Sequence, residues 1–214
     1  MIWLLPGMDG TGLLYTRLRE HLGSSQASTV ARYEGGTYEG IEASLPNALR
    51  APASSDVLVA ESFGGPLALR IAARHRVARV VLVASFVCAP RPLPPGRLVA
   101  ALHPPPKLGI RMGMLGRDAD EALVAEVAET LKRVDGAVLG QRIEALRTID
   151  ARAELAAITA DVIWPRATRD RLVPASATAL ARSVRPGLDV RAIDGPHLLA
   201  QRCPTEVAAA IMTA

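Results

Sequence analysis

The sequence predicts an α/β fold in which a parallel sheet of about six strands is covered by helices on both faces. Short apolar runs alternate along the chain with segments whose apolar residues recur at helical spacing, and this alternation is typical of βαβ units. The alternation stops between residues 90 and 152, where prolines and helical patterns occur without a strand. We therefore expect a core formed by residues 1–89 and 153–214 and a small helical cap formed by residues 90–152.

The expected strands are apolar runs bounded by turn-forming residues, as in a sheet that is buried on both sides. They lie at residues 2–5, 28–33, 56–60, 79–85, 161–164 and 188–193. Helical patterns connect them at residues 13–22, 39–50, 64–76, 176–184 and 204–212. Pro46 puts the continuity of the second helix in doubt, because proline lacks the N–H that a helix interior needs.

Two helices are predicted inside the cap. Asp118 and Glu121 have the spacing of a capping box at the start of the first helix. The second spans residues 138–149, with Leu139, Ile143 and Leu146 on one face. Five further apolar residues of the cap either line a substrate pocket or pack the cap against the core; they are Leu98, Leu102, Met112, Met114 and Leu115.

Composition excludes several classes of protein. A chain of 214 residues suits one α/β domain, and its 50% apolar content excludes a disordered chain. Only 3% of the residues are aromatic and the net charge of +4 is spread along the chain, so we expect no nucleic-acid partner. Cys88 and Cys203 lack the spacing of a metal site and are expected to be buried free thiols. Without a signal-peptide pattern or an apolar run of about 20 residues, we expect a cytoplasmic protein that does not bind membranes.

The most informative stretch is Ala60-Glu61-Ser62-Phe63-Gly64, which joins a predicted strand to a predicted helix. In a sharp strand–turn–helix of this kind, the serine is pushed out of the sheet edge and its Oγ is exposed to a base. Gly64 removes the Cβ that would obstruct such a tight turn. The pattern is A-x-S-x-G because Ala60 stands where G-x-S-x-G has its first glycine. The alternative is a buried strand followed by a glycine-rich connection with an incidental serine.

Two more polar residues follow predicted strands whose carboxyl ends lie at the same edge of the sheet. Asp170 comes after the strand at 161–164, and His197 comes after the last strand. Ligands of open parallel sheets bind at this edge. A serine hydroxyl needs a base, and a histidine held by a carboxylate supplies one. The chain order Ser62, Asp170, His197 is therefore consistent with a nucleophile, an acid and a base.

Other residues compete for these roles. His21 and His75 lie on predicted helices away from the strand ends, and His103 precedes Pro104 in the cap, where it is a poor fixed base but can line a pocket. Asp194 is a rival acid, but a residue three positions from His197 in the same loop would rarely reach its Nδ1. We interpret Asp194 as a turn former.

The loop Pro6-Gly7-Met8 follows the first strand, next to the strand that carries Ser62. Acyl transfer needs N–H donors aimed at the oxygen that becomes negatively charged. The N–H groups of Met8 and Phe63 are the candidates for this oxyanion hole. The alternative is that Pro6-Gly7 only turns the chain.

These segments carry a resemblance. The loop Leu5-Pro6-Gly7-Met8-Asp9-Gly10-Thr11-Gly12 and the segment from Ala60 to Ala68 resemble the α/β-hydrolase superfamily, most closely its branch of pimeloyl-[acyl-carrier-protein] methyl ester esterases and related carboxylesterases. The resemblance implies Ser62 as nucleophile, Asp170 as acid, His197 as base, and Met8 and Phe63 as oxyanion donors. Pro6 stands where that family usually has histidine, which affects how the loop is braced. The family's first hairpin is absent, so about six strands are expected instead of eight.

The resemblance implies hydrolysis of a small carboxylic ester through an acyl-serine, without a metal or an organic cofactor. Basic residues in the cap suggest the hypothesis that the ester is carried on acyl carrier protein, which is strongly acidic. Two alternatives remain: acyl transfer to an alcohol by the same residues, and a non-catalytic binding protein with this fold. The sequence makes no prediction of oligomeric state, acyl length or alcohol.

Overall fold

The computed structural model describes residues 1–23 and 26–213, and it contains a six-stranded sheet in which every neighbouring pair of strands is parallel. The strand order is β2-β1-β3-β4-β5-β6. The strands are β1 Ile2–Leu5, β2 Ser28–Val30, β3 Val57–Glu61, β4 Arg79–Val83, β5 Asp161–Ala167 and β6 Asp189–Ile193. The predicted α/β class and the number of strands are confirmed.

Several element boundaries differ from the sequence prediction. β4 ends at Val83 instead of residue 85, and β5 runs three residues further than expected, to Ala167. The strand expected at 28–33 ends at Val30, since it pairs with β1 over three residues only, at the edge of the sheet. The helix expected at 39–50 is two helices, α2 Tyr38–Ser44 and α3 Asn47–Arg50, separated at Pro46. Proline cannot donate the hydrogen bond that would continue α2, and its ring disfavours a helical conformation of the residue that precedes it.

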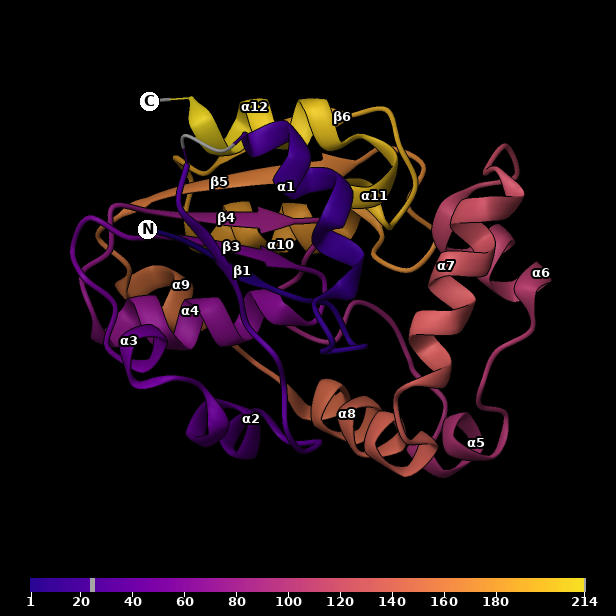
Figure 1. The fold of residues 1–214 in the computed structure, drawn as a ribbon. Coiled ribbons are helices and arrows are strands. Elements are labelled where there is room, and N and C mark those ends of the chain that lie inside the picture. Colours follow the sequence, from indigo (N-terminus) through magenta and orange to yellow (C-terminus); the bar gives the residue numbers. More distant parts are fainter. Residues whose placement is uncertain (24–25, 214) are drawn as a thin grey trace.

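Alternate residues of the strands face opposite layers of helices. Trp3 and Leu5 belong to one hydrophobic cluster, while Ile2 and Leu4 belong to the other. Figure 1 shows one layer above the sheet and one below it. The upper layer contains α1 Thr16–Leu22, α11 Leu199–Arg202 and α12 Pro204–Met212, and the lower contains α2, α4 Gly64–Arg74, α9 Arg152–Ala157 and α10 Ala175–Val184. A 3-10 turn, Leu13–Tyr15, precedes α1.

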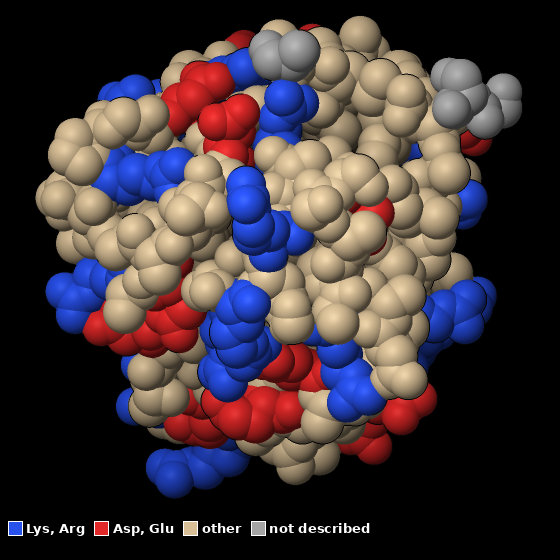
Figure 2. Space-filling view, turned by 90° about the vertical axis from the view of Figure 1, so that its left-hand side faces the viewer, with Lys and Arg blue, Asp and Glu red and all other residues tan. Residues whose placement is uncertain are grey.

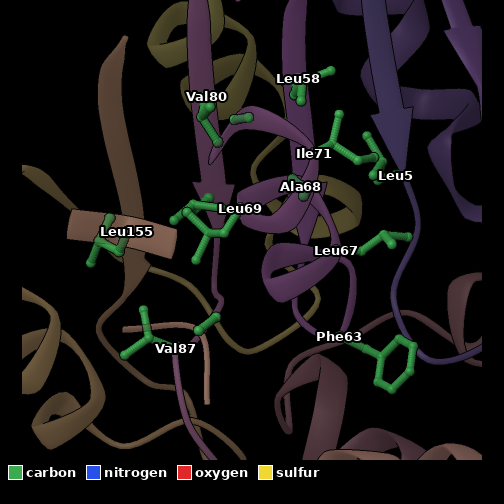
Figure 3. Close-up of a cluster of buried hydrophobic side chains, with 14 of the residues drawn as sticks. Leu5, Leu58, Phe63, Leu67, Ala68, Leu69, Ile71, Val80, Val87 and Leu155 are labelled. Atoms are coloured by element: carbon green, nitrogen blue, oxygen red, sulfur yellow. The ribbon is translucent and has the colours of Figure 1, made fainter. Parts of the chain in front are cut away.

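Helix α4 is the central element of the lower layer. Its residues Leu67, Ala68, Leu69 and Ile71 are fully buried against the sheet. Figure 3 shows Leu69 on the side of α4 that faces Leu155 of α9, Leu67 and Ile71 on the side that faces Leu5, and Phe63 at the beginning of α4. Because α4 begins two residues after Ser62, its packing fixes the position of that serine.

The cap consists of helices joined by proline-rich turns and lies beyond the carboxyl ends of the strands (Figure 1). Its elements are α5 Gly96–Ala101, α6 Lys107–Ile110, a π-helical turn Arg111–Leu115, α7 Glu121–Lys132 and α8 Gly136–Thr148. The predicted capping residue of α7 was wrong: Asp120 caps the helix by accepting from the N–H of Leu123. Asp118 lies outside the first turn of α7 and forms an ion pair with Arg202 of the core instead.

Charges of both signs are interspersed on the face that looks away from the cap (Figure 2). In the described part of the chain no helix has the length and apolar character to cross a bilayer, and no group of three or more His, Cys, Asp or Glu side chains has the arrangement of a metal site. Cys88 and Cys203 are free, as predicted, but both are half-buried. The thiol of Cys88 reaches the rim of the core, where it contacts Asp150.

Candidate active site

Ser62 occupies a strained turn between β3 and α4. Its φ of 49° lies in the left-handed region, which residues other than glycine seldom adopt. Hydrogen bonds on both sides hold this conformation: the Ser62 N–H donates to Val83 O (2.9 Å), and Ser62 O accepts from Ser85 Oγ (2.8 Å) and Gly65 N (3.0 Å). The turn therefore holds the serine at the carboxyl edge of the sheet.

The glycine two positions after the serine is required by the neighbouring strand. A Cβ on Gly64 would lie 2.6 Å from Pro6 O and 2.8 Å from Leu5 O, so the end of β1 passes directly beside the turn. Ala60, which replaces the first glycine of the usual pattern, is fully buried in the core. The turn thus depends on Gly64, while Ala60 is accommodated by packing.

The structure brings the three predicted side chains together in one hydrogen-bonded chain. His197 Nε2 lies 2.9 Å from Ser62 Oγ, and His197 Nδ1 lies 2.8 Å from Asp170 Oδ2. The side chains of His197 and Asp170 are each only 4% exposed. A carboxylate accepts a hydrogen bond from Nδ1–H, so the proton stays on Nδ1 and Nε2 keeps a lone pair directed at the serine hydroxyl.

Asp170 is itself held in place by the backbone. Its Oδ1 accepts from the N–H groups of Leu172 and Val173, both at 2.8 Å, so Oδ2 is the oxygen that faces the imidazole. Asp194, the rival acid, is in an exposed turn and binds Thr168 Oγ1 (2.9 Å) and Arg169 Nε (3.0 Å). Asp194 therefore lies in the position of a turn residue.

Met8 and Phe63 are both neighbours of Ser62. Met8 lines the same cavity as Ser62, and Phe63 follows the serine directly. Among the described residues, neither the Met8 N–H nor the Phe63 N–H has a hydrogen-bond acceptor. Amides without an acceptor beside a nucleophile's hydroxyl are suited to receive an anionic oxygen.

All three tyrosines of the chain brace this region, which the sequence analysis did not predict. Their hydroxyls donate to backbone carbonyls: Tyr15 to Leu5 (2.7 Å), Tyr33 to Pro6 (2.9 Å) and Tyr38 to Phe63 (3.1 Å). Burial raises the pKa of each of these phenols well above its ordinary value, so they remain neutral donors. A sequence signal existed, because a chain poor in aromatic residues has all of its tyrosines between positions 15 and 38.

A cavity of about 310 Å³ opens above Ser62 and His197. Its walls are mostly aliphatic and come from both the core and the cap: Leu14, Val99, Leu102, Pro105, Met114, Leu131, Leu139, Leu172 and Leu198. His103 of the cap also lines this cavity, in agreement with the expectation from the sequence that it can line a pocket. A larger, more open groove of about 950 Å³ runs between α2 and the cap helices α5 and α8, but it contains none of the three hydrogen-bonded residues.

Of the five cap residues considered for the substrate pocket, two line this cavity, Leu102 and Met114. The other three lie elsewhere. Leu98 is half-exposed on α5, Met112 lines a separate surface pocket, and Leu115 is fully buried in the cap's own hydrophobic cluster. Sequence reasoning missed Val99 of α5 and Leu139 of α8 as pocket residues, although both line the cavity together with Ser62.

Comparisons with known proteins agree with this architecture. A sequence profile of the Alpha/beta hydrolase family matches residues 4–210. No curated protein sequence matches the chain.

Three solved structures illustrate the similarity of the fold. An enol-lactonase from Burkholderia xenovorans LB400 aligns with a TM-score of 0.83 at 16% identity, over 97% of this chain and 88% of that one. A lipase-esterase related protein from Clostridium acetobutylicum ATCC 824 gives 0.81 at 16% identity, over 97% and 91%. A bromoperoxidase from Bacillus anthracis gives 0.80 at 16% identity, over 99% and 90%. At these identities the similarity concerns the fold.

Proposed function

Because this chain belongs to the Alpha/beta hydrolase family, we propose that it is a serine hydrolase that cleaves a carboxylic ester through an acyl-serine intermediate. The observation that carries the proposal is the chain of hydrogen bonds from Ser62 through His197 to Asp170 at the floor of an apolar cavity. The two amides without acceptors beside Ser62 add support.

In the first half of the reaction, His197 Nε2 takes the proton of Ser62 Oγ while that oxygen attacks the ester carbonyl. The negative charge on the carbonyl oxygen is received by the N–H groups of Met8 and Phe63, each typically contributing a few kcal/mol. When the intermediate collapses, the carbon–oxygen bond to the alcohol breaks, and His197 gives the proton to the departing alkoxide. Asp170 holds the imidazole in the required tautomer throughout.

In the second half, water enters beside the acyl-serine and loses a proton to His197. The hydroxide adds to the acyl carbon, and the bond to Ser62 Oγ breaks as His197 returns the proton to the serine. The aliphatic cavity walls suit an apolar acyl chain, whose transfer from water contributes roughly 25 cal/mol per Å² of buried surface.

The test is a panel of esters with increasing acyl length, measured with the wild type and with Ser62→Ala. We expect the variant to fold normally and to lose at least about 10³-fold in kcat, because only the covalent route is removed. Ser183→Ala, an exposed serine on α10, is the matched control. Turnover by Ser62→Ala within tenfold of the wild type would refute the assignment.

Two further measurements separate the alternatives. A fluorophosphonate probe labels a nucleophilic serine, so an unlabelled Ser62 would indicate a non-catalytic binding protein. Product analysis with and without an added alcohol distinguishes hydrolysis from acyl transfer, because a transferase forms a new ester at the expense of the free acid.

A narrower proposal concerns the carrier of the ester. Five exposed cap cations have no carboxylate within 4.0 Å among the described residues: Arg91, Arg97, Lys107, Arg117 and Arg133. They favour an acidic partner, and the resemblance to pimeloyl-[acyl-carrier-protein] methyl ester esterases of biotin synthesis indicates acyl carrier protein, which would place the enzyme in the cytoplasm. Carrier-bound methyl ester should then lose kcat/KM steeply as salt rises, since salt screens the cap's charge. An equal salt response for a free short-chain ester would leave a general carboxylesterase.

A further inference from the structure

Arg142 of cap helix α8 is the most deeply buried cation of the described chain, with 2% of its surface exposed. Its guanidinium donates to four backbone carbonyls of two core loops. The acceptors are Met8 O (2.7 Å), Asp9 O (2.8 Å), Gly35 O (3.1 Å) and Tyr33 O (3.2 Å). Four of its five N–H groups are therefore used, and every acceptor lies outside the cap.

Burying the charged guanidinium of Arg142 costs free energy unless hydrogen bonds within the protein replace those it makes with water. No carboxylate of the described residues lies within 4.0 Å of the Arg142 guanidinium. Burial lowers the pKa of this guanidinium, while the more distant charge of Asp9 raises it. A buried charge without an ion pair depends on its hydrogen bonds for stability, and hydrogen bonds from a charged donor are roughly twice as strong as neutral ones.

Two of the carbonyls that Arg142 binds, those of Met8 and Asp9, belong to the loop that carries the Met8 N–H. Only the φ and ψ angles of Met8 separate its N–H from its C=O, because the peptide units themselves are planar. Arg142 fixes the carbonyl of Met8, and Tyr33 fixes the carbonyl of Pro6 on the other side of the same amide. The Met8 N–H is thus held between two anchored peptide units.

The loop is shaped to admit the guanidinium. Gly10 has a φ of +67°, and a Cβ there would lie 2.7 Å from Arg142 Nη1 and 2.8 Å from Tyr33 Cβ. No side chain fits between the loop and the arginine. One turn earlier on α8, Leu139 lines the cavity above Ser62, so this helix contacts both the substrate space and the loop.

From this geometry we propose that Arg142 is a positioning residue for the ester hydrolysis: it holds the Met8 N–H in the orientation that receives the oxyanion, and it couples the seating of the cap to that orientation. The inference rests on the proposed function. In this chain, Arg142 braces the loop in place of the histidine that the resemblance leads one to expect at the position of Pro6.

The experiment compares Arg142→Lys with Arg147→Lys, an exposed arginine on the same helix that pairs with Glu144. Lysine keeps the charge but is a compact donor that cannot span four carbonyls. For Arg142→Lys we expect kcat to fall about 10- to 100-fold with KM within threefold, because misplacement by about 1 Å costs up to 10²-fold. Labelling of Ser62 by a fluorophosphonate should slow by a similar factor, and amide exchange over residues 7–12 should quicken. Arg147→Lys should change none of these.

The outcomes are distinct. An unchanged kcat with a lowered Tm would make Arg142 a structural link only, and a raised KM with unchanged kcat would make it part of the cavity wall; either result overturns the proposal. If the wild type neither turns over esters nor reacts with the fluorophosphonate, the proposed function fails, and this inference falls with it. Arg142→Gln, which keeps two donors, provides the same readouts if the lysine variant does not fold.

Discussion

Asp170→Asn provides a sharp test because the structure determines how the new amide must sit. The Oδ1 of Asp170 accepts two backbone N–H groups, from Leu172 and Val173, each at 2.8 Å. An asparagine must keep its oxygen toward these two donors, since turning its NH₂ toward them would leave both without an acceptor in a buried site. The NH₂ group therefore faces His197 Nδ1.

The consequence falls on the tautomer of His197. An amide N–H directed at Nδ1 requires a lone pair there, so the ring proton moves to Nε2, the atom 2.9 Å from Ser62 Oγ. A protonated Nε2 cannot accept the serine proton. Loss of this tautomer in a serine protease lowers kcat by about 10⁴, or about 5 kcal/mol of transition-state stabilisation. Because the two backbone hydrogen bonds remain, we expect the stability to change little.

The assay is steady-state hydrolysis of the best ester of the panel, with Tm as the measure of folding. Asp194→Asn is the matched control: this carboxylate is 80% exposed, contacts Arg169 and should change kcat less than about threefold, as surface ion pairs contribute little. If Asp170→Asn retains activity within tenfold, or if Asp194→Asn is the more impaired, the reasoning about the acid is wrong.

Three further predictions follow from the packing. Gly64→Ala should lower both Tm and kcat because its Cβ meets backbone oxygens at 2.6 and 2.8 Å, whereas Gly187→Ala, with nothing within 4 Å, should be neutral; equal effects would contradict this. Val99→Trp should fill part of the cavity and reduce kcat/KM for long acyl chains more than for acetyl, and a uniform loss would argue against an acyl pocket. Burial raises the pKa of Asp56, but hydrogen bonds to its carboxylate, led by the one from Trp3 Nε1, outweigh this effect and lower the pKa below its ordinary value. The ionised carboxylate therefore stabilises the fold at neutral pH, and this stabilisation is lost as the pH falls below about 3.9. Asp56→Asn should lower Tm at pH 7 and make Tm fall less steeply in acid, whereas a Tm–pH curve parallel to that of the wild type would contradict the argument.

The sheet could be predicted because parallel strands buried on both faces are continuous apolar runs with few alternatives. The site followed from topology: residues separated by more than 100 positions meet when each follows a strand whose carboxyl end lies at the same edge. Ser62 and His197 are 135 positions apart and lie at hydrogen-bonding distance. Their chemical roles remain predictions until the variants are measured.

The interior of the cap could not be predicted in the same way. Its helices carry apolar residues on more than one face, and which face lines the cavity depends on how α5 and α8 cross, a property that periodicity does not contain. Leu98 and Leu115 therefore looked equivalent to Leu102, although one is half-exposed and one is packed inside the cap. The capping residue of α7 was misplaced by two positions because Asp118 and Asp120 are equally good N-cap residues in sequence.

Arg142 shows a second reason why part of the site could not be predicted from the sequence. In a helix with polar neighbours an arginine is typical of a solvent-exposed face, and the helix itself gives no sign of burial. The reason for an arginine at this position lies in another part of the chain. Where the chain leaves the sheet near Ser62, backbone carbonyls are buried without a partner in a neighbouring strand, and buried carbonyls need hydrogen-bond donors. Three tyrosine hydroxyls supply three of these bonds and Arg142 supplies four. The residue that completes the loop is thus specified by backbone groups more than 100 positions away, and only the folded chain reveals that requirement.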